Sequence, residues 1–241
     1  MGASDQMKEK TVDSAQVVSA EDVDWDVETD VLIVGGGGCG LVAAPAASEN
    51  TDLVVTVLEK SDELGGNTAL STGMIPAAGS RFQEAAGNED SPNAMARDIL
   101  EKNGHQADEE MVRRLCRQSR HLVHWLVDQC DVDFQFVDDF KYPRQSEYRM
   151  HAPPGRHGSH LVDDLLSEIE DRGNIELLPN VPVRCLVADE GAVVGVVAGE
   201  RQTESIRAEK VLLATDGFGG NRRMVEESIG EGASEFLYYG V

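Results

Sequence analysis

The sequence predicts an α/β fold with a central parallel sheet, covering helices and an added antiparallel β layer. Between residues 30 and 58, short apolar runs rich in branched residues flank a helical stretch, the pattern of parallel strands buried on both faces. After about residue 175 the apolar pattern changes to a period of two with Gly turns, which indicates antiparallel strands. A parallel core extended by antiparallel strands accounts for both patterns.

The bulk composition favours a folded and acidic protein. The chain has 241 residues, 41% of them hydrophobic, which suits one large domain. Its formal net charge is −23, with 44 Asp and Glu against 21 Lys and Arg. Such a charge repels nucleic acid and anionic lipid, so neither is an expected partner. It also favours a halophilic source, with an acidic enzyme from ordinary salinity as the alternative.

The N-terminal segment carries many acidic residues and little periodicity. We expect residues 1–26 to be an acidic flexible tail and residues 27–241 to form the folded domain. The tail lacks the apolar centre of a secretory signal, and the chain has no run of about 18 apolar residues. We therefore expect a cytoplasmic protein without a membrane span. The cysteine spacing fits no redox pair or zinc pattern, so we expect reduced thiols and no metal site at Cys39, Cys116, Cys130 and Cys185.

The elements follow in order from these patterns. Residues 30–34 and 53–58 are expected to be strands, with a helix of small residues over 41–47 that contains Pro45. An extended loop over residues 65–79 precedes a helix over 92–104, for which Ser91 is the N-cap. A longer helix begins at Asp108, and its apolar face is expected to hold Met111, Leu115, Leu122, Val123, Leu126 and Val127.

The second half of the chain contains one more helix and several short strands. A loop over residues 141–159 leads to a helix over about 160–172. The expected strands are 175–178, 183–188, 193–198, 205–207 and 211–214.

A glycine-rich turn follows the first strand. Gly35, Gly37 and Gly40 occupy the fixed positions of G-x-G-x-x-G, with Gly38 between them. Glycine permits the tight turn, the close approach of a pyrophosphate and the packing of helix on sheet, while the helix N-terminus offers free N–H groups to phosphate. Because a strand precedes the turn and a helix and second strand follow it, the context is that of a Rossmann-like FAD- or NAD(P)-binding domain.

A carboxylate stands where this type of site needs one. Glu59 follows the second strand, 24 residues after Gly35. A carboxylate there accepts hydrogen bonds from ribose hydroxyls and disfavours a 2′-phosphate, so NADP is not expected.

Three separated stretches resemble one flavoprotein family. Residues 59–73, which include Gly65-Gly66-Asn67-Thr68, are similar to the FAD-binding stretch of the fumarate reductase and succinate dehydrogenase flavoprotein family, which includes 3-ketosteroid dehydrogenases. Residues 180–186 resemble the family strand whose backbone meets the adenine. Residues 211–218 resemble its second FAD motif, although Asp216 stands where that motif usually has Gly. The resemblance covers about residues 28–240.

This resemblance implies FAD as the cofactor and a set of residues that hold it. The glycine pair lets the chain pass close to the cofactor, and the polar residues after it can reach the pyrophosphate and ribityl chain. The expected cofactor-binding residues are Gly35, Gly37, Gly38, Gly40, Glu59, Lys60, Gly66, Asn67, Thr68, Thr72, Gly73, Val183, Ala214, Thr215 and Gly217.

The resemblance also implies a non-covalent flavin and an incomplete catalytic site. Family members with covalent flavin carry a His between positions 66 and 73, whereas all six His of this chain lie at position 105 or later. The family places its substrate carboxylate clamp and its proton-donating Arg in a capping domain and a C-terminal segment. We expect both to be absent from this chain, supplied instead by a partner chain or a missing segment, and we assign no catalytic acid.

Polar residues of the loop over 141–159 are candidates for binding a substrate anion. Arg149, His151 and Arg156 could face the flavin or a carboxylate. The alternative, to which we give more weight, is that they are solvated loop residues or salt-bridge partners. His121 and His124 lie three apart on a helix, but without further ligands they favour packing over metal binding.

The sequence leaves three functions open. The first is a flavin oxidoreductase of the fumarate reductase or 3-ketosteroid dehydrogenase type, which transfers hydride through flavin N5 at a C–C bond next to a carbonyl or carboxylate of a small-molecule substrate. The second is a truncated, non-catalytic FAD-binding fragment. The third is a pyridine-nucleotide enzyme of another family, which the motifs at 65–68 and 215–217 disfavour.

Overall fold

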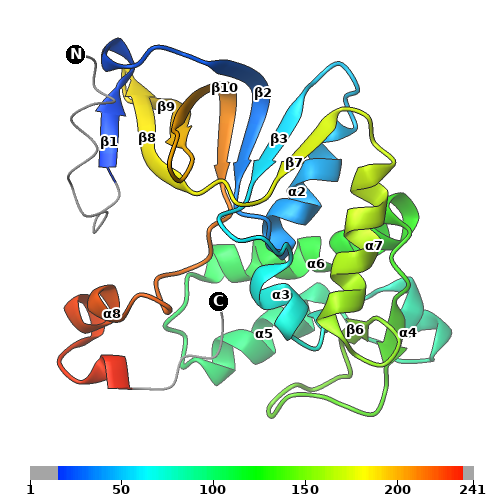
Figure 1. Cartoon of the computed structure of the whole chain (residues 1–241). Helices are drawn as coiled ribbons and strands as arrows, with labels where there is room; N and C mark the ends of the chain where they lie inside the picture. The colour runs from blue at the N-terminus through cyan, green and yellow to red at the C-terminus, as the bar shows by residue number, and fades with distance from the viewer. Residues whose placement is uncertain (1–15, 236–241) are drawn as a thin grey trace. The chain divides into compact units, whose positions relative to one another are not determined.

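The computed structural model of the chain describes residues 16–235, and these divide into two compact units (Figure 1). The first unit contains residues up to 67 and from 169 onward, and the second contains residues 68–168. Within the described part of the chain, no helix combines the length and the apolarity that crossing a bilayer requires.

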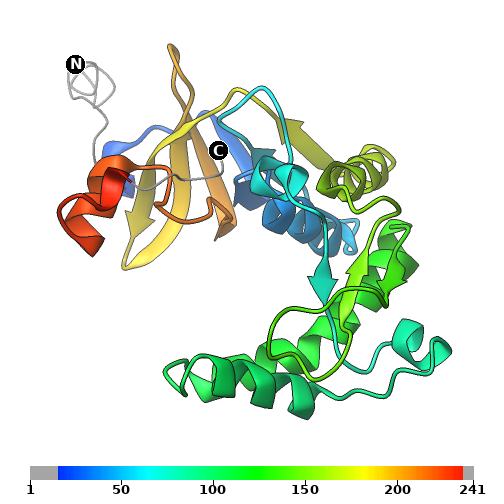
Figure 2. The same ribbon diagram turned by 90° about the horizontal axis from the view of Figure 1, so that it is seen from below.

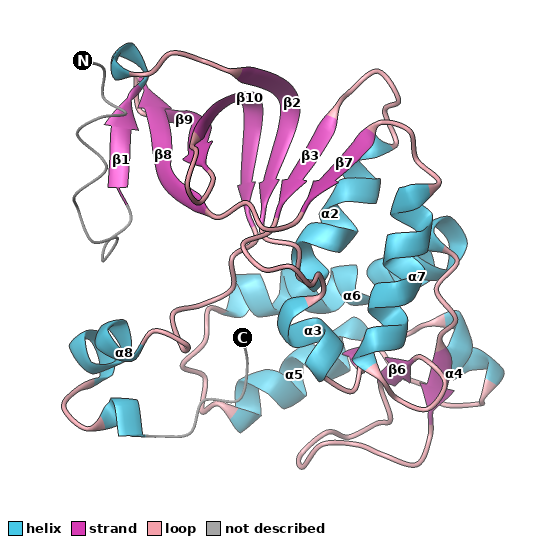
Figure 3. Ribbon diagram, viewed as in Figure 1, coloured by secondary structure: helices cyan, strands magenta, loops and turns pink. Residues whose placement is uncertain are grey.

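A seven-stranded sheet forms the first unit, in the order β1-β8-β9-β10-β2-β3-β7 (Figure 3). The pairs β10–β2, β2–β3, β3–β7 and β1–β8 are parallel, whereas β8–β9 and β9–β10 are antiparallel. The predicted α/β class is confirmed, and the antiparallel strands continue the edge of the parallel sheet. The bounds are β1 Gln16–Ser19, β2 Val27–Val34, β3 Val55–Leu58, β7 Ile175–Leu178, β8 Val183–Asp189, β9 Ala192–Ala198 and β10 Glu204–Leu213.

The centre of this sheet is buried on both faces. Leu32 and Ile33 of β2 are fully buried, and so is every residue of β3. Such runs of branched residues suit parallel strands covered on both sides. Helix α2, Gly38–Ser48, contacts β2, β3 and β7 (Figure 2). Its small residues allow this close packing, and the proline at position 45 lies inside the helix as predicted.

The second unit is mainly helical. Helices α5 and α6 lie side by side (Figure 2), and a small antiparallel sheet has the order β4-β6-β5. The predicted cap at Ser91 is confirmed, since its side chain accepts from the backbone N of Ala94. Asp108, where a longer helix was expected to begin, is the N-cap of that helix, and its side chain accepts from the backbone N of Met111. The bounds are β4 Ile75–Pro76, α4 Arg81–Ala85, α5 Pro92–Lys102, α6 Glu109–Cys130, β5 Gln135–Val137 and β6 Met150–Ala152.

Five further elements complete the description. Helix α3, Gly66–Leu70, and helix α7, Gly158–Glu170, each contribute residues to both units. In the first unit, α8 spans Arg222–Ile229, and the 3-10 helices η2 and η3 span Ala20–Asp22 and Ala233–Glu235.

The expected flexible tail is wrong for residues 16–26. Strand β1 pairs in parallel with β8, so that Val17 lies opposite Leu186. Trp25 packs over Gly195, where an added Cβ would lie 2.7 Å from the indole ring. Burial of this ring together with Val18 against the sheet orders the segment in spite of its charge. Residues 1–15 lie outside the described part of the chain.

Four further expectations need correction. The loop expected over residues 65–79 contains helix α3 and strand β4, and the loop over 141–159 contains β6. The strands expected at 205–207 and 211–214 are one continuous strand, β10, because it pairs with β2 from residue 206 to residue 213, while residues 204–207 also pair with β9. The buried face of α6 contains Val112, Cys116 and Cys130 in place of Met111, Leu115 and Leu122, which are exposed.

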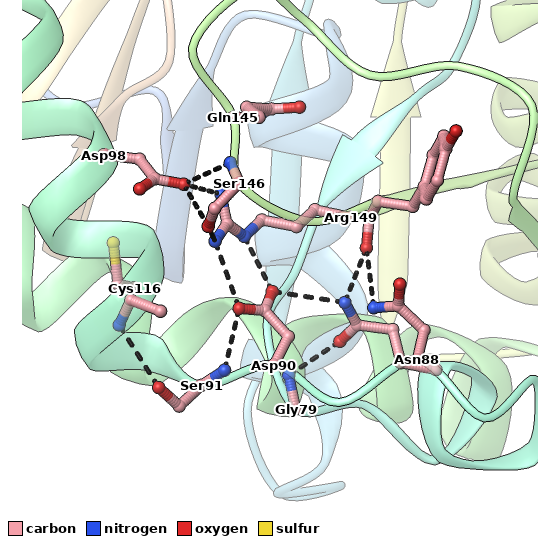
Figure 4. Close-up of polar contacts among 12 residues, drawn as sticks. Gly79, Asn88, Asp90, Ser91, Asp98, Cys116, Gln145, Ser146 and Arg149 are labelled. Atoms are coloured by element: carbon pink, nitrogen blue, oxygen red, sulfur yellow. Dashed lines mark hydrogen bonds and ion pairs between the residues drawn. The ribbon is translucent and has the colours of Figure 1, made fainter.

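A buried ion cluster joins α5 to the segment before β6 (Figure 4). Arg149 is fully buried; its Nε donates to Asp90 Oδ2 over 2.6 Å and its Nη1 to Asp98 Oδ2 over 2.7 Å. Ser146 adds a backbone N–H and a hydroxyl to the same Asp98 oxygen, each at 2.8 Å. Each charged group therefore has partners, as a charge removed from water requires.

The pKa shifts of the cluster agree with this geometry. Burial by itself lowers the pKa of Arg149, but the hydrogen bonds and charges of Asp90 and Asp98 outweigh it and raise the pKa above its ordinary value. Burial raises the pKa of Asp98, but the hydrogen bonds from Ser146 and Arg149 outweigh it and leave that pKa lowered. Arg149 and Asp98 are therefore charged at neutral pH, and their ion pair connects α5 to the segment before β6.

We expect the substitution Arg149→Met to lower the free energy of unfolding by about 3–5 kcal/mol, because two buried carboxylates lose their counter-charge. The measurement is urea denaturation followed by circular dichroism. Arg113→Met is the matched control: Arg113 pairs with Glu109 on an exposed helix face, and its loss is expected to cost less than about 0.5 kcal/mol. Equal losses in the two variants would contradict the structural role of the cluster.

Candidate functional site

The glycine turn joins β2 to α2 by a close approach of three backbone segments. Gly35 has a φ of +112° and donates its N–H to Leu58 O over 2.7 Å. A Cβ at Gly35 would lie 2.4 Å from Ala214 O. A Cβ at Gly40 would lie 1.9 Å from Gly35 O. Glycine is required at both positions, since side chains there would push apart the strand ends and the helix.

The N-terminus of α2 at Gly37 has more open space beside it than Gly35 and Gly40 have. Gly37 is the N-cap residue, and no described side chain caps the helix there. An added Cβ at Gly37 would have only Gly65 O within 4 Å, at 3.9 Å. Backbone N–H groups at the first turn of a helix carry partial positive charge and attract anions. The turn is therefore shaped to receive an anionic group.

Glu59 faces this turn. Its Oε2 accepts from Gly36 N over 2.8 Å and its Oε1 from Ser61 N over 2.9 Å. The backbone oxygen of Glu59 accepts from Val181 N over 2.8 Å, which brings the segment before Val183 to the same end of the site. The sequence expectation that residue 59 lies beside the glycine turn agrees with this orientation.

The glycine pair at 65–66 lies directly against the turn. Gly65 N donates to Gly36 O over 2.8 Å, and a bridge links Gly37 with Gly65. Both residues of the pair have positive φ, and a Cβ at Gly66 would lie 3.6 Å from Gly37 Cα. The chain at Gly65 and Gly66 thus passes close to the N-terminus of α2, and larger residues at these two positions would move it away.

The end of β10 closes the other side of the turn. Ala214 N donates to Val34 O over 2.8 Å. Two residues later, Asp216 Oδ2 accepts from Asn67 Nδ2 over 2.6 Å, and its Oδ1 accepts from Gly217 N over 2.8 Å. Two motifs that are 149 residues apart in the sequence therefore meet through one side-chain hydrogen bond.

The remaining predicted residues divide between the two units. Lys60 is exposed beside Glu59 in the first unit. Thr68, Thr72 and Gly73 belong to the second unit, where a Cβ at Gly73 would lie 3.1 Å from Gly158 Cα. In the first unit, the structure brings together Gly35, Gly37, Gly38, Gly40, Glu59, Gly66, Asn67, Ala214, Thr215 and Gly217.

The three candidates for binding a substrate anion have other surroundings. Arg149 is buried in its ion cluster and has no side-chain exposure to offer a ligand. Arg156 is partly exposed and pairs with Asp139. The salt-bridge interpretation therefore describes both arginines. Among the described residues, no group of three His, Cys, Asp or Glu side chains is placed to hold a metal ion.

His151 is buried together with a serine that the sequence reasoning missed. Ser80 Oγ lies 2.7 Å from His151 Nε2, and both residues are fully buried. The rings of Phe82 and Phe136 lie 5.6 and 5.7 Å from the imidazole, and Nδ1 has no hydrogen-bond partner among the described residues. Burial lowers the pKa of His151 to about 4. The sequence signal that could have pointed to Ser80 was its spacing from Gln83, with which it forms a capping box for α4.

Comparison with known proteins gives one family. The model of the FAD binding domain family matches residues 30–238. The urocanate reductase of Eggerthella lenta is 34% identical over 201 residues, which are 82% of this chain and 33% of that protein. A probable fumarate reductase of Shewanella frigidimarina is 32% identical over 202 residues, 82% of this chain and 34% of that protein.

Solved structures agree with these relatives. A 3-ketosteroid-Δ4-(5α)-dehydrogenase from Rhodococcus jostii, solved with 4-androstene-3,17-dione, has a TM-score of 0.77 and 32% identity over 87% of this chain and 50% of that one. An open flavocytochrome c3 fumarate reductase has a TM-score of 0.78 and 28% identity over 94% of this chain and 41% of that one. The chain spans about a third of the curated relatives named above.

The buried imidazole of His151 makes the folded state sensitive to acid. Its folded pKa of about 4 lies below the ordinary 6.5, so between these values the unfolded chain binds a proton that the folded chain does not. The stabilisation is complete above pH 6.5 and is lost as pH falls toward 4. We expect it to fall by about 2 kcal/mol between pH 7 and pH 5.

Urea unfolding at the two pH values measures this loss. His151→Gln keeps a hydrogen-bonding side chain without the titration, so its stability is expected to fall less over the same range. His160→Gln, at an exposed imidazole, is the matched control and is expected to behave as the wild type does. A wild-type profile that matches that of His151→Gln would contradict the assignment.

Proposed function

This chain belongs to the FAD binding domain family of oxidoreductases, and from that premise we propose that it holds the adenosine and diphosphate part of FAD without a covalent bond. The observation that carries the proposal is the open N-terminus of α2 beside the Glu59 carboxylate. A positive helix end and a carboxylate hydrogen-bond acceptor, side by side, match a diphosphate joined to a ribose.

The diphosphate would lie against the first turn of α2. Gly37 leaves room for it, because an added Cβ there would have only Gly65 O within 4 Å and no described side chain caps the helix at this residue. Gly65 and Gly66 pass beside the turn and keep the backbone close. Backbone N–H groups then bind phosphate oxygens, an interaction that requires no charged side chain.

The ribose and adenine would lie toward Glu59 and Val183. The Glu59 carboxylate already accepts two backbone N–H groups, and each of its oxygens retains a lone pair for a ribose hydroxyl. The bond from Val181 N to Glu59 O supports an adenine position along the backbone at Val183. A 2′-phosphate beside this carboxylate would be repelled, which favours FAD over NADP.

The bound flavin would supply the redox chemistry, carrying a hydride at N5. We propose a substrate with a C–C bond next to a carbonyl or carboxylate, as in the fumarate and the 3-ketosteroid named for the relatives. The described residues contribute binding and orientation, and we assign none of them as a catalytic acid. Buried Arg149 and His151 cannot donate a proton to a ligand without a large rearrangement.

We also propose that a further segment or partner chain completes the site. Residues 208–213 of β10 pair with β2 on one edge, and no described strand pairs with their other edge. Leu212 and Leu213 are exposed there, although β10 lies inside the sheet order. Unpaired backbone and exposed apolar side chains on one strand suit an added strand. On this view, the chain alone binds FAD and does not turn over substrate; it is the FAD-binding part of a larger catalytic assembly.

The test is a visible spectrum of the chain purified with FAD, followed by anaerobic reduction with one equivalent of dithionite and addition of fumarate or a 3-ketosteroid. A flavin spectrum without reoxidation supports an FAD-binding part that needs completion. Reoxidation by the chain alone would place catalytic groups within these 241 residues and would overturn the proposed division.

Gly37→Ala tests the diphosphate position. The new methyl group meets no atom closer than 3.9 Å, so the protein is expected to fold normally, but the methyl group would occupy the space of the phosphate. We expect FAD affinity to fall at least about tenfold, or about 1.4 kcal/mol. Flavin fluorescence titration measures this. The control is Gly173→Ala, since Gly173 has no atom within 4 Å of an added Cβ; equal affinities in the two variants would contradict the site.

Non-covalent binding gives a second expectation. None of the residues from 66 to 73 is a His, so acid precipitation is expected to release all FAD into the supernatant. Absorbance of the supernatant and of the redissolved pellet at 450 nm measures the partition. A pellet that stays yellow would contradict the proposal.

A further inference from the structure

Asp216 occupies a position with an unusual backbone and a carboxylate close to the glycine turn. Its φ is +61°, a left-handed conformation that Gly adopts freely and that Asn and Asp tolerate better than other residues. This explains why the resembling motif usually has Gly here. The backbone is therefore compatible with Gly, Asn or Asp, and the choice of Asp adds a charge that the fold does not require.

The carboxylate is held between the two segments that flank the turn. Asn67 comes directly after Gly66, which packs against Gly37. Asp216 comes two residues after Ala214, whose oxygen lies against Gly35. The 2.6 Å hydrogen bond from Asn67 Nδ2 to Asp216 therefore joins both flanking segments across the turn. The other carboxylate oxygen accepts from Gly217 N over 2.8 Å.

Both donors belong to residues that the sequence predicts to bind the cofactor. Asn67 and Gly217 would offer N–H groups to FAD, but here they donate to an anion of the chain itself. We propose that Asp216 is an internal competitor of the FAD diphosphate, which rests on the proposed function. FAD binds when the hydrogen bond between Asn67 and the Asp216 carboxylate breaks. Asp216 thereby lowers the affinity of the chain for FAD.

Two physical effects act in the same direction. The diphosphate carries negative charge, and a carboxylate near it is repelled. The hydrogen bonds of Asp216 must also be broken or rearranged before their donors reach the cofactor, so binding includes that cost. Asp216 is exposed, so its carboxylate has room to turn toward solvent. The competition therefore requires only a side-chain rotation.

Two substitutions separate charge from hydrogen bonding. Asp216→Asn removes the charge but keeps an oxygen that can accept from Asn67 and a residue that tolerates positive φ. We expect it to tighten FAD binding about fivefold, which is the size of one charge interaction across about 4 Å of water. Asp216→Gly removes both effects and is expected to tighten binding at least as much. The gain for Asp216→Asn is expected to shrink in high salt.

The matched controls are Asp131→Asn and Asp131→Gly. Asp131 is an exposed aspartate with a φ of +50° at the end of α6, in the second unit, so the same substitutions change the same charge and backbone class away from the turn. Their FAD affinity is expected to equal that of the wild type. ADP is the second probe. Its diphosphate has a free end and carries more negative charge than that of FAD, so its affinity is expected to rise at least as much in the Asp216 variants.

Flavin fluorescence and calorimetric titration of the full chain give the dissociation constants. Equal FAD affinity for the wild type and both Asp216 variants would overturn the competition while leaving FAD binding intact. Weaker binding by the variants would make Asp216 a cofactor ligand and overturn the proposal as well. An effect on FAD without one on ADP would place the contact away from the diphosphate. Absence of binding by all variants and the wild type would instead defeat the proposed function, and the competition with it.

Discussion

The contact between the carbonyl of Gly35 and Gly40 is the constraint on which the site depends. A single methyl group at Gly40 would lie 1.9 Å from that oxygen. Because the helix begins this close to the strand end, its N–H groups lie over the carboxyl end of β2, where Glu59 and Ala214 also arrive from the neighbouring strands β3 and β10. The parallel arrangement of these strands gathers segments from positions 35, 59 and 214 at one edge of the sheet.

Features with a local cause could be predicted from the sequence, and features with a distant partner could not. The glycine turn, the caps of α5 and α6 and the strand Ile175–Leu178 follow from neighbouring residues. Trp25 gave no such signal, since its ordering depends on Gly195 of β9. The exposed side of α6 was misassigned for the same reason: Met111 and Val112 are both apolar, and the packing of α5 decides which of them is buried.

The same distinction between local causes and distant partners applies to the residues of the candidate site. The residue types at the turn, and Glu59 beside it, were recognisable because the chemistry of a diphosphate and a ribose restricts them strongly. The positive φ of residue 216 and its bond to Asn67 were not, because they depend on the meeting of segments 149 residues apart. Arg149 was ambiguous for a related reason. An arginine that binds a ligand and one that pairs with Asp90 are the same in sequence, and only burial distinguishes them.

The two aspartate environments show how an acidic protein can give carboxylates different roles. Asp90 and Asp98 are withdrawn from water and share one guanidinium, so removing Arg149 leaves two carboxylates that the interior cannot solvate. Asp216 remains in water, where an unpaired carboxylate costs little, and its bond to Asn67 can break and form freely. A buried carboxylate thus fixes structure, whereas an exposed carboxylate beside an anion site can alter affinity without altering the fold. The large excess of acidic residues makes the distinction important, because burial and position, and not the number of charges, determine which of them act on the site.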